Sequence, residues 1–134
     1  MDLVRVMTIV VVTGSRSLRL HEDRLKIKRA FFDAIDVWNP QDLYHGGADG
    51  PDSWAALEYP EIARVFRPIE SPARTPAQRL FDRNETMINT AISDAMLSER
   101  AVVLVACWDG KSSGTRHAMN HAHRRGVHID EVRW

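Results

Sequence analysis

The amino-acid sequence predicts an α/β fold: a Rossmann-like three-layer sandwich in which a mainly parallel sheet of about five strands carries helices on both faces. Short apolar runs alternate along the chain with segments whose apolar residues recur at helical spacing. Several apolar runs end directly in glycine-bearing turns, as buried parallel strands do. No linker, internal repeat or low-complexity tract divides the 134 residues, so we expect residues 1–134 to form a single domain.

The first predicted strand and helix come from the amino-terminal part of the chain. Residues 4–12 are rich in β-branched side chains and end at the turn Thr13-Gly14-Ser15-Arg16. A helix is expected from about residue 22 to residue 36 because apolar residues recur there at helical spacing, and Asn39-Pro40 ends it. The apolar positions of this helix are Leu25, Phe31, Phe32 and Ile35.

A glycine-rich loop follows the second predicted strand. Residues 42–44 form this short strand, and His45-Gly46-Gly47-Ala48-Asp49-Gly50-Pro51-Asp52-Ser53 comes directly after it. A short helix is expected over residues 52–59, where Asp and Ser suit the capping position, and Pro60 ends it. Residues 63–69 are a candidate third strand.

The second half of the chain predicts two more helices and two more strands. Thr75-Pro76-Ala77-Gln78 has the spacing of a capping box, with proline at the first helical position. The following helix places on one face Leu80, Met87, Ile88, Ala91, Ile92 and Ala95. Residues 101–106 are wholly apolar and predict a strand buried on both sides. A last helix over about 116–125 is capped by Gly126, and residues 127–132 predict a fifth strand.

Composition predicts a soluble, cytoplasmic protein. The 18 basic and 18 acidic side chains cancel, so the net charge gives no general attraction to nucleic acid or to an anionic membrane. The apolar run at the start is too short to span a bilayer. The lone Cys107 forms no internal disulfide, which is typical of a reducing compartment. We therefore expect no membrane partner and no nucleic-acid partner.

Three predicted strands end in polar loops that contain glycine, at residues 13–16, 45–53 and 109–115. The carboxyl ends of parallel strands meet at one edge of a sheet, and ligands bind there where the strand order reverses. Glycine allows close backbone approach, the following helices supply free N–H groups, and hydroxyl and cationic side chains suit phosphate. The loops supply these expected nucleotide- or phosphate-binding residues: Gly14, Ser15, Arg16, Gly46, Gly47, Asp52, Ser53, Gly110, Lys111, Ser112, Ser113, Gly114 and Thr115.

The sequence gives little support for nucleotide-hydrolysis, dinucleotide-binding or metal-binding motifs. The loops have neither the spacing of a P-loop nor that of the G-x-G-x-x-G fingerprint, which disfavours an ATPase or an NAD dehydrogenase. His117 and His121 share a helix face, but no cysteine pair or carboxylate lies at obvious ligand spacing, so we expect no metal. Trp108 borders the third loop, where it suits base stacking, a hydrophobic lid or a dimer contact. No cofactor is expected.

Four segments in chain order carry a resemblance to a known family. They are Val10-Val11-Val12-Thr13-Gly14-Ser15-Arg16, then His45 to Ser53, then Arg83-Asn84-x-x-Met87, then Gly110 to Thr115. Together they resemble the SLOG superfamily, in particular its small stand-alone YspA-like branch, from about residue 9 to the end. The resemblance implies a Rossmann-like fold, a pocket for nucleotides or nucleotide-derived ligands, and frequent homodimers. Arg83 and Asn84 then join the expected site, as contacts to a phosphate and to a ribose or base.

Relatives in this superfamily include the cytokinin-activating phosphoribohydrolases of the LOG type, which carry an Arg-Lys-x-x-Met segment. They also carry a Gly-Gly-x-Gly-Thr loop that is followed closely by a catalytic glutamate. Arg83 and Met87 match the first segment, and Gly114-Thr115 matches the end of the second. The sequence departs from that pattern because Asn84 replaces the lysine and Arg116, His and Ala follow the threonine in place of the glutamate.

Another acid would have to supply a hydrolase's general base. The candidates are Glu70, after the third predicted strand, and Glu85, beside Arg83. The catalytic set is therefore incomplete, and whether the chain is an enzyme stays open at this level.

The sequence is compatible with three candidate functions. The leading one is a binding or sensing domain for a phosphate-bearing nucleotide or nucleotide derivative. The alternative is a phosphoribohydrolase or other N-glycosidic bond hydrolase acting on nucleotides. A DNA-processing role like that of DprA comes third, because the neutral charge and the lack of an aromatic-basic stripe argue against it. We also expect a homodimer, since an exposed edge strand such as residues 127–132 gains from pairing.

Overall fold

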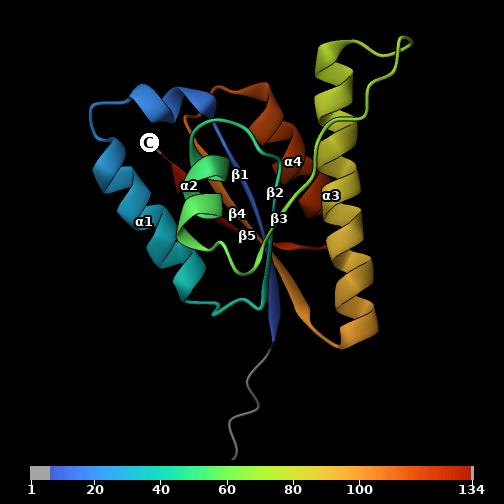
Figure 1. Cartoon of the computed structure of the whole chain (residues 1–134), viewed down its shortest axis with the longest axis horizontal. Helices are drawn as coiled ribbons and strands as arrows, with labels where there is room; N and C mark the ends of the chain where they lie inside the picture. The colour runs from blue at the N-terminus through green and yellow to red at the C-terminus, as the bar shows by residue number, and fades with distance from the viewer. Residues whose placement is uncertain (1–6, 134) are drawn as a thin grey trace, which may run out of the picture.

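A computed structural model describes residues 7–133, which form one five-stranded, wholly parallel sheet with helices on both faces (Figure 1). The strand order is β3-β2-β1-β4-β5. The strands are β1 (Thr8–Gly14), β2 (Asp42–His45), β3 (Ala63–Val65), β4 (Ala101–Trp108) and β5 (His128–Arg133). The helices are the 3-10 turn η1 (Arg16–Leu20), α1 (Arg24–Asp36), α2 (Pro51–Glu58), α3 (Pro76–Ser98) and α4 (Ser113–Arg124). The predicted α/β, Rossmann-like class is confirmed.

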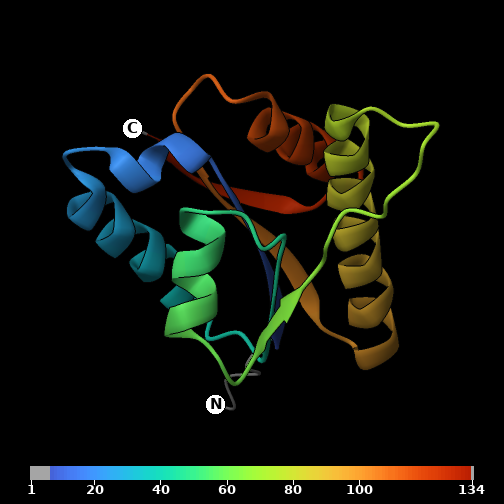
Figure 2. The same ribbon diagram turned by 45° about the horizontal axis from the view of Figure 1, so that its top comes forward.

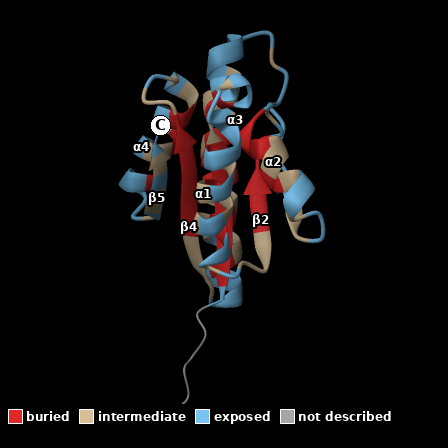
Figure 3. Cartoon of the chain, turned by 90° about the vertical axis from the view of Figure 1, so that its left-hand side faces the viewer, coloured by how far each residue is buried: buried red, intermediate tan, exposed pale blue. Residues whose placement is uncertain are grey.

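The alternation of β1 explains the two layers of helices. Val10 and Val12 pack with α1 and α2 in one fully buried cluster. Ile9 and Val11 point the other way and pack with α3 and α4 in a second cluster. Figure 3 shows the result: buried strands lie between helices whose outward faces are exposed. A strand buried on both faces is apolar at every position, which is why β1 and β4 read as continuous apolar runs.

The direction in which successive strands are added to the sheet changes between β1 and β4: β2 and β3 lie on one side of β1, and β4 and β5 lie on the other. β1 pairs with β2 on one side and with β4 on the other, and Gly14 lies opposite Cys107 at the carboxyl end. The connections therefore leave β1 and β4 in different directions, which opens space between the loops that follow these two strands. This is the edge at which the sequence predicts a ligand site.

Several boundaries differ from the predicted ones. The part of the first predicted strand at residues 4–6 lies outside the described residues, and β1 begins at Thr8. β3 ends at Val65 rather than 69: Phe66 still donates to the His45 carbonyl, and Pro68 has no N–H to continue the ladder. Leu25 was predicted to face the core but is 71% exposed.

The buried residues of α1 are Ile27, Phe31 and Ile35. Which residues of an amphipathic helix are buried depends on how the helix is rotated about its axis against the sheet. α4 begins at Ser113, three residues before its predicted start, because the polar turn after β4 continues directly into helix.

Two predicted helix ends are confirmed. Thr75 and Gln78 form both hydrogen bonds of the capping box at the start of α3, with Pro76 at the first helical position. Gly126 follows the end of α4 with a φ of 72°, the left-handed conformation that favours glycine. None of the described helices is long and apolar enough to cross a membrane.

Candidate functional site

A cleft of about 330 Å³ lies at the carboxyl edge of the sheet, between the loops after β1 and β4 and the amino-terminal ends of α2 and α4. It lies toward the upper end of β1 in Figure 1. Its walls are Thr13, Gly14, Ser15, Arg16, Ser17, Ala48, Asp52, Leu80, Arg83, Asn84, Asp109, Ser112, Ser113, Gly114 and Thr115. Parts of all three predicted loops therefore meet at one site, together with one face of α3.

Ser15 and Asp109 join the first loop to the third. Ser15 donates its N–H to the Cys107 carbonyl at 2.9 Å, and its hydroxyl lies 2.8 Å from the Ser112 hydroxyl. The carboxylate of Asp109 accepts from Ser17 Oγ at 2.6 Å and from the N–H groups of Lys111 and Ser112, both at 2.8 Å. Burial alone would raise the pKa of Asp109, but these hydrogen bonds prevail and lower it to about 2. A permanently ionised aspartate thus holds the loop in shape.

The amino-terminal end of α4 opens into the cleft at Ser113, Gly114 and Thr115. The first N–H groups of a helix have no intrahelical partner and carry the positive end of the dipole. The capping residue, Ser112, makes no side-chain bond to them. A β-carbon placed on Gly114 would meet no atom within 4 Å, so the space beside this residue is open. This arrangement suits an anion.

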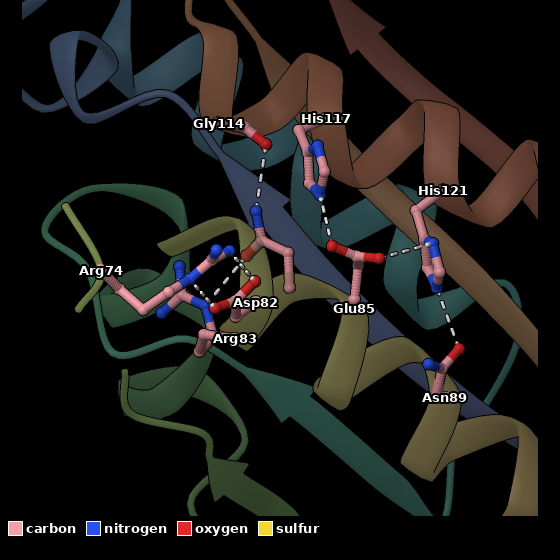
Figure 4. A network of polar contacts seen from close by, with 9 residues as sticks. Arg74, Asp82, Arg83, Glu85, Asn89, Gly114, His117 and His121 are labelled. Carbon is pink, nitrogen blue, oxygen red and sulfur yellow. Dashed lines mark hydrogen bonds and ion pairs between the residues drawn. The ribbon is translucent and has the colours of Figure 1, made fainter. Parts of the chain in front are cut away.

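Arg83, labelled in Figure 4, and its neighbour Asn84 belong to α3 and join it to the other walls. Arg83 Nη1 donates to the Gly46 carbonyl at 2.6 Å, and Arg83 Nε donates to Asn84 Oδ1 at 2.9 Å. Asn84 Nδ2 then donates to the Gly114 carbonyl at 3.1 Å. Burial lowers the pKa of Arg83, the charge of Asp52 opposes this shift, and the charge of Arg16 adds to it. An arginine side chain nevertheless stays protonated in proteins. Two cationic groups therefore stand at the cleft.

The Arg83 guanidinium packs directly against Gly46 of the second loop. A β-carbon on Gly46 would lie 2.1 Å from Arg83 Nη1. Gly47 has a φ of 72° and donates its N–H to His45 Nδ1 at 3.1 Å. Both glycines, predicted as ligand contacts, lie outside the cleft walls and shape the loop from behind.

Asp52 occupies the floor of the cleft and is only 4% exposed. Its Oδ2 accepts from the N–H groups of Gly46 at 3.0 Å and Ala48 at 3.3 Å. Its Oδ1 is buried and has no hydrogen-bond partner among residues 7–133. Burial raises the pKa of this carboxyl to about 6, against the opposing effect of the two N–H groups and of the charges of Arg83 and Arg16. The sequence offers no signal for the free oxygen.

The capping role predicted for Asp52 and Ser53 is wrong. Gly50 is the residue that precedes α2, and Pro51 takes the first helical position. Asp52 therefore lies inside the first turn and bends back to the glycine loop, while Ser53 Oγ donates to the Gly50 carbonyl at 2.9 Å.

Gly110 and Lys111 also lie outside the cleft walls, as Ser53 does. Gly110 adopts a φ of 81° in the turn after β4, and the side chain of Lys111 is exposed. The sequence correctly places them in the third loop, but the turn held by Asp109 directs them to solvent.

The two glutamates proposed as substitute bases lie away from the cleft. Glu70 is exposed on the segment between β3 and α3. Glu85 faces α4, where Oε2 lies 3.3 Å from His117 Nε2 and Oε1 lies 3.7 Å from His121 Nδ1 (Figure 4). These contacts hold the two helices together. In the described part of the chain, no group of three or more His, Cys, Asp or Glu side chains is arranged to hold a metal ion.

Trp108 supports the third loop from outside the cleft. Its Nε1 donates to the Ser112 carbonyl at 3.0 Å. The guanidinium groups of Arg133 and Arg116 lie over its ring, 4.6 and 5.4 Å from the centroid. The ring faces are engaged by cations, so base stacking in the cleft is not its role in this arrangement.

A second hollow of about 290 Å³ lies beside the cleft, and Arg83 lines both. Figure 2 shows the segment after β3 running past the amino-terminal end of α3, where this hollow lies. Its walls are Phe66, Arg67, Ile69, Ser71, Arg74, Asp82, Arg83 and Thr86. The sequence analysis missed it because its residues come from a proline-rich loop without a recognisable motif.

The fold and site define a Rossmann-like α/β protein with a polar cleft at the switch point of its sheet. No family model matches the chain, and no curated protein matches it significantly. Among solved structures, the chain is similar to a dodecameric FMN-dependent UbiX-like decarboxylase from Escherichia coli O157:H7. The identity is 16%, the TM-score is 0.35, and the match covers 92% of this chain and 77% of the other.

Proposed function

We propose that this chain binds a phosphate-bearing nucleotide or nucleotide derivative in the cleft, as a ligand-binding or sensing domain. The observation that carries the proposal is the open amino-terminal end of α4, which faces a cleft with Arg16 and Arg83 at its sides. A phosphate there accepts from the N–H groups of Ser113, Gly114 and Thr115 and is attracted by two guanidinium groups.

The charge balance of the cleft supports an anionic ligand. Arg16 is exposed and forms no ion pair within residues 7–133. Arg83 donates to carbonyl and amide oxygens, which leave its positive charge unneutralised. Asp109 and Asp52 also line the cleft, but the Asp109 carboxylate accepts from three donors of its loop and Asp52 Oδ2 accepts from two N–H groups. An anion at the end of α4 therefore meets cations that the chain itself leaves available.

The proposed relation to the SLOG superfamily follows the same residues. All four resembling segments contribute cleft walls, three of them through Gly14 to Arg16, Arg83-Asn84 and Ser112 to Thr115. The second segment contributes Ala48 and Asp52. Motif residues from four separate segments that collect at one cleft support a shared ligand class.

The first test is a thermal-shift and calorimetric screen against AMP, ADP, ATP, ADP-ribose, NAD, cyclic nucleotides and ribose 5-phosphate. A ligand that binds only the native state raises the melting temperature according to its concentration and affinity. Arg16→Ala should abolish the shift, and Arg29→Ala, an exposed arginine on α1, should retain it. A full screen without any shift, or a shift equal in both variants, contradicts the proposal.

Hydrolysis of an N-glycosidic bond is the second candidate, favoured by one observation: the cleft contains a buried carboxyl with an unengaged oxygen. In that case Asp52, rather than Glu70 or Glu85, supplies the carboxylate near the ribosyl carbon. Incubation with nucleoside monophosphates should then release free base. Release must disappear in Asp52→Asn and persist in Glu70→Gln, and the reverse result excludes this candidate.

We also propose a homodimer in the cytoplasm. Both β3 and β5 are edge strands, and β5 is the longer of the two with six residues. Pairing protects such an edge. Light scattering coupled to size exclusion gives the mass directly: about twice 15.3 kDa supports the dimer, and a monomer mass rejects it. Localisation is tested by fractionation of cells that express the tagged chain.

A further inference from the structure

We propose that Asp52 selects the ligand: its free oxygen accepts a hydrogen bond from a hydroxyl group on the sugar that carries the phosphate. The site then takes a phosphorylated sugar or nucleotide with that hydroxyl in place, and discriminates against the deoxy compound. This inference rests on the proposed function and deepens it.

A carboxylate on the floor of an anion site opposes the anion's charge, so its position requires a reason. Oδ2 provides part of one, because it holds the N–H groups of Gly46 and Ala48 in the second loop. Oδ1 takes no part in that structure. A buried acceptor without a donor costs free energy, and proteins normally satisfy such an atom.

The two nearby arginines do not reach this oxygen. Arg83 directs Nη1 to the carbonyls of Gly46 and Phe66 and Nε to Asn84. Neither Arg83 nor Arg16 forms an ion pair with Asp52, although the charges of both act on it. Moving the Arg83 guanidinium to Asp52 would release the Gly46 carbonyl. No donor among residues 7–133 reaches Oδ1, and we infer that the ligand supplies it.

The chemistry of the missing donor identifies the ligand class. At pH 8 a phosphate monoester is a dianion, which has no proton to donate and carries the same sign of charge as Asp52. A sugar hydroxyl is neutral and donates, and it is attached to the phosphate that the end of α4 suits. One ligand can thus engage both ends of the cleft: its phosphate binds at the amino-terminal end of α4 near Arg16 and Arg83, and its hydroxyl donates to Asp52 Oδ1.

The test compares matched ligands by isothermal titration calorimetry at pH 8, where Asp52 is ionised. The pairs are ribose 5-phosphate with 2-deoxyribose 5-phosphate, and AMP with 2′-deoxy-AMP and 3′-deoxy-AMP. The wild-type chain should prefer a hydroxyl-bearing member by about tenfold or more, the size expected for a hydrogen bond to a charged group. Inorganic phosphate alone should bind weakly.

Asp52→Asn is the informative variant because its amide oxygen can still accept from Gly46 and Ala48. It should reduce the preference to roughly threefold or less, while inorganic phosphate binds equally well or more tightly because a like charge is gone. Asp49→Asn is the matched control: Asp49 lies on the same loop, pairs with Arg19 at 2.8 Å and is not a cleft wall. It should keep the wild-type preference.

The outcomes separate the two proposals. Equal affinity of the wild-type chain for hydroxyl and deoxy compounds, or an unchanged preference in Asp52→Asn, overturns the role of Asp52 and leaves phosphate binding intact. Failure of every phosphate compound to bind the wild-type chain overturns the proposed function together with this inference.

Discussion

At the scale of single residues, the shape of the cleft depends on polar side chains that already form hydrogen bonds to the surrounding loops. Asp109 fixes the third loop, Arg83 holds the second, and Ser15 ties the first to the third. Ser15 and Arg83 bond to groups far away in sequence, and Asp109 joins the distant Ser17 to the nearby Lys111 and Ser112. The cleft walls are therefore largely in place before any ligand arrives, which lowers the cost of binding.

Asp52 also makes stability depend on pH. Its pKa is about 6 in the folded chain, above the ordinary 3.8, so the folded state holds the proton more tightly than the unfolded state does. The free energy of unfolding therefore decreases as pH rises from about 4 through 6, because Asp52 loses its proton at lower pH in the unfolded state than in the folded state. Above that range, ionised Asp52 destabilises the fold. Asp52→Asn should gain on the order of 2 kcal/mol relative to wild type between pH 4 and pH 8.

Urea unfolding of both proteins at the two pH values measures this difference. If the free energies of unfolding of the two proteins change in parallel with pH, Asp52 has an ordinary pKa, and the account of its burial is wrong.

Gly14 is required by close packing against α2. A β-carbon there would lie 2.3 Å from both Cβ and Cγ of Pro51, a ring that cannot rotate away. Gly14→Ala should therefore lower the free energy of unfolding by about 1–3 kcal/mol through overpacking. Chemical denaturation gives the value, and a change below a few tenths of a kcal/mol would show that α2 shifts freely.

At the scale of elements, α4 combines two tasks. Its buried face packs on the sheet through Thr115, Ala118 and Ala122, and its first turn forms one wall of the cleft. The Glu85 contacts to His117 and His121 and the stacking of Phe81 on His117, 4.3 Å between ring centroids, attach it to α3. Because Asn84 also reaches the Gly114 carbonyl, the position of the binding end follows the packing of the two helices.

Gly114→Ala separates the two tasks of α4. The added methyl group meets no atom within 4 Å and replaces a helical glycine, so stability should be unchanged or higher by up to about 1 kcal/mol. The same methyl group extends into the space that a phosphate needs near the first N–H groups, so affinity should fall. Thermal unfolding and calorimetry on one sample measure both effects, and undiminished affinity would place the phosphate elsewhere.

At the scale of the whole molecule, the burial of the strands decreases from the centre of the sheet toward the edge formed by β3. β1 and β4 lie between two strands each, and their inward residues are fully buried. β3 has three residues, of which Arg64 and Val65 are exposed, and the following segment is exposed almost throughout. The second hollow lies against this segment, so a ligand that extends past Arg83 contacts the least anchored part of the fold.

Native-state hydrogen exchange should follow this order. Amides of β1 and β4 should exchange only through global unfolding, and those of residues 66–75 should exchange fastest among the internal segments. A bound nucleotide should increase protection in α4 and in the second loop. Equal protection of β3 and β1 would contradict the proposed gradient.

The sequence was informative wherever local chemistry decides the structure. Continuous apolar strands, the Thr75–Gln78 capping box and Gly126 predicted elements that the structure contains, because periodicity, capping and backbone sterics act within a few residues. It failed where the choice depends on distant groups. The capping role of Asp52 was wrong because Pro51 starts the helix and two N–H groups of the preceding loop bind the carboxylate.

The sequence alone established the α/β class, the three glycine-bearing loops and the expectation that they share one edge of the sheet. The tertiary structure decided which members of those loops form the cleft: Ser112 and Thr115 do, and Gly46 and Lys111 do not. It also placed Glu85 beside the histidines of α4 and left one oxygen of Asp52 without a donor among residues 7–133. The physical reason is that side-chain direction and burial depend on how helices rotate against the sheet, and distant residues set that rotation.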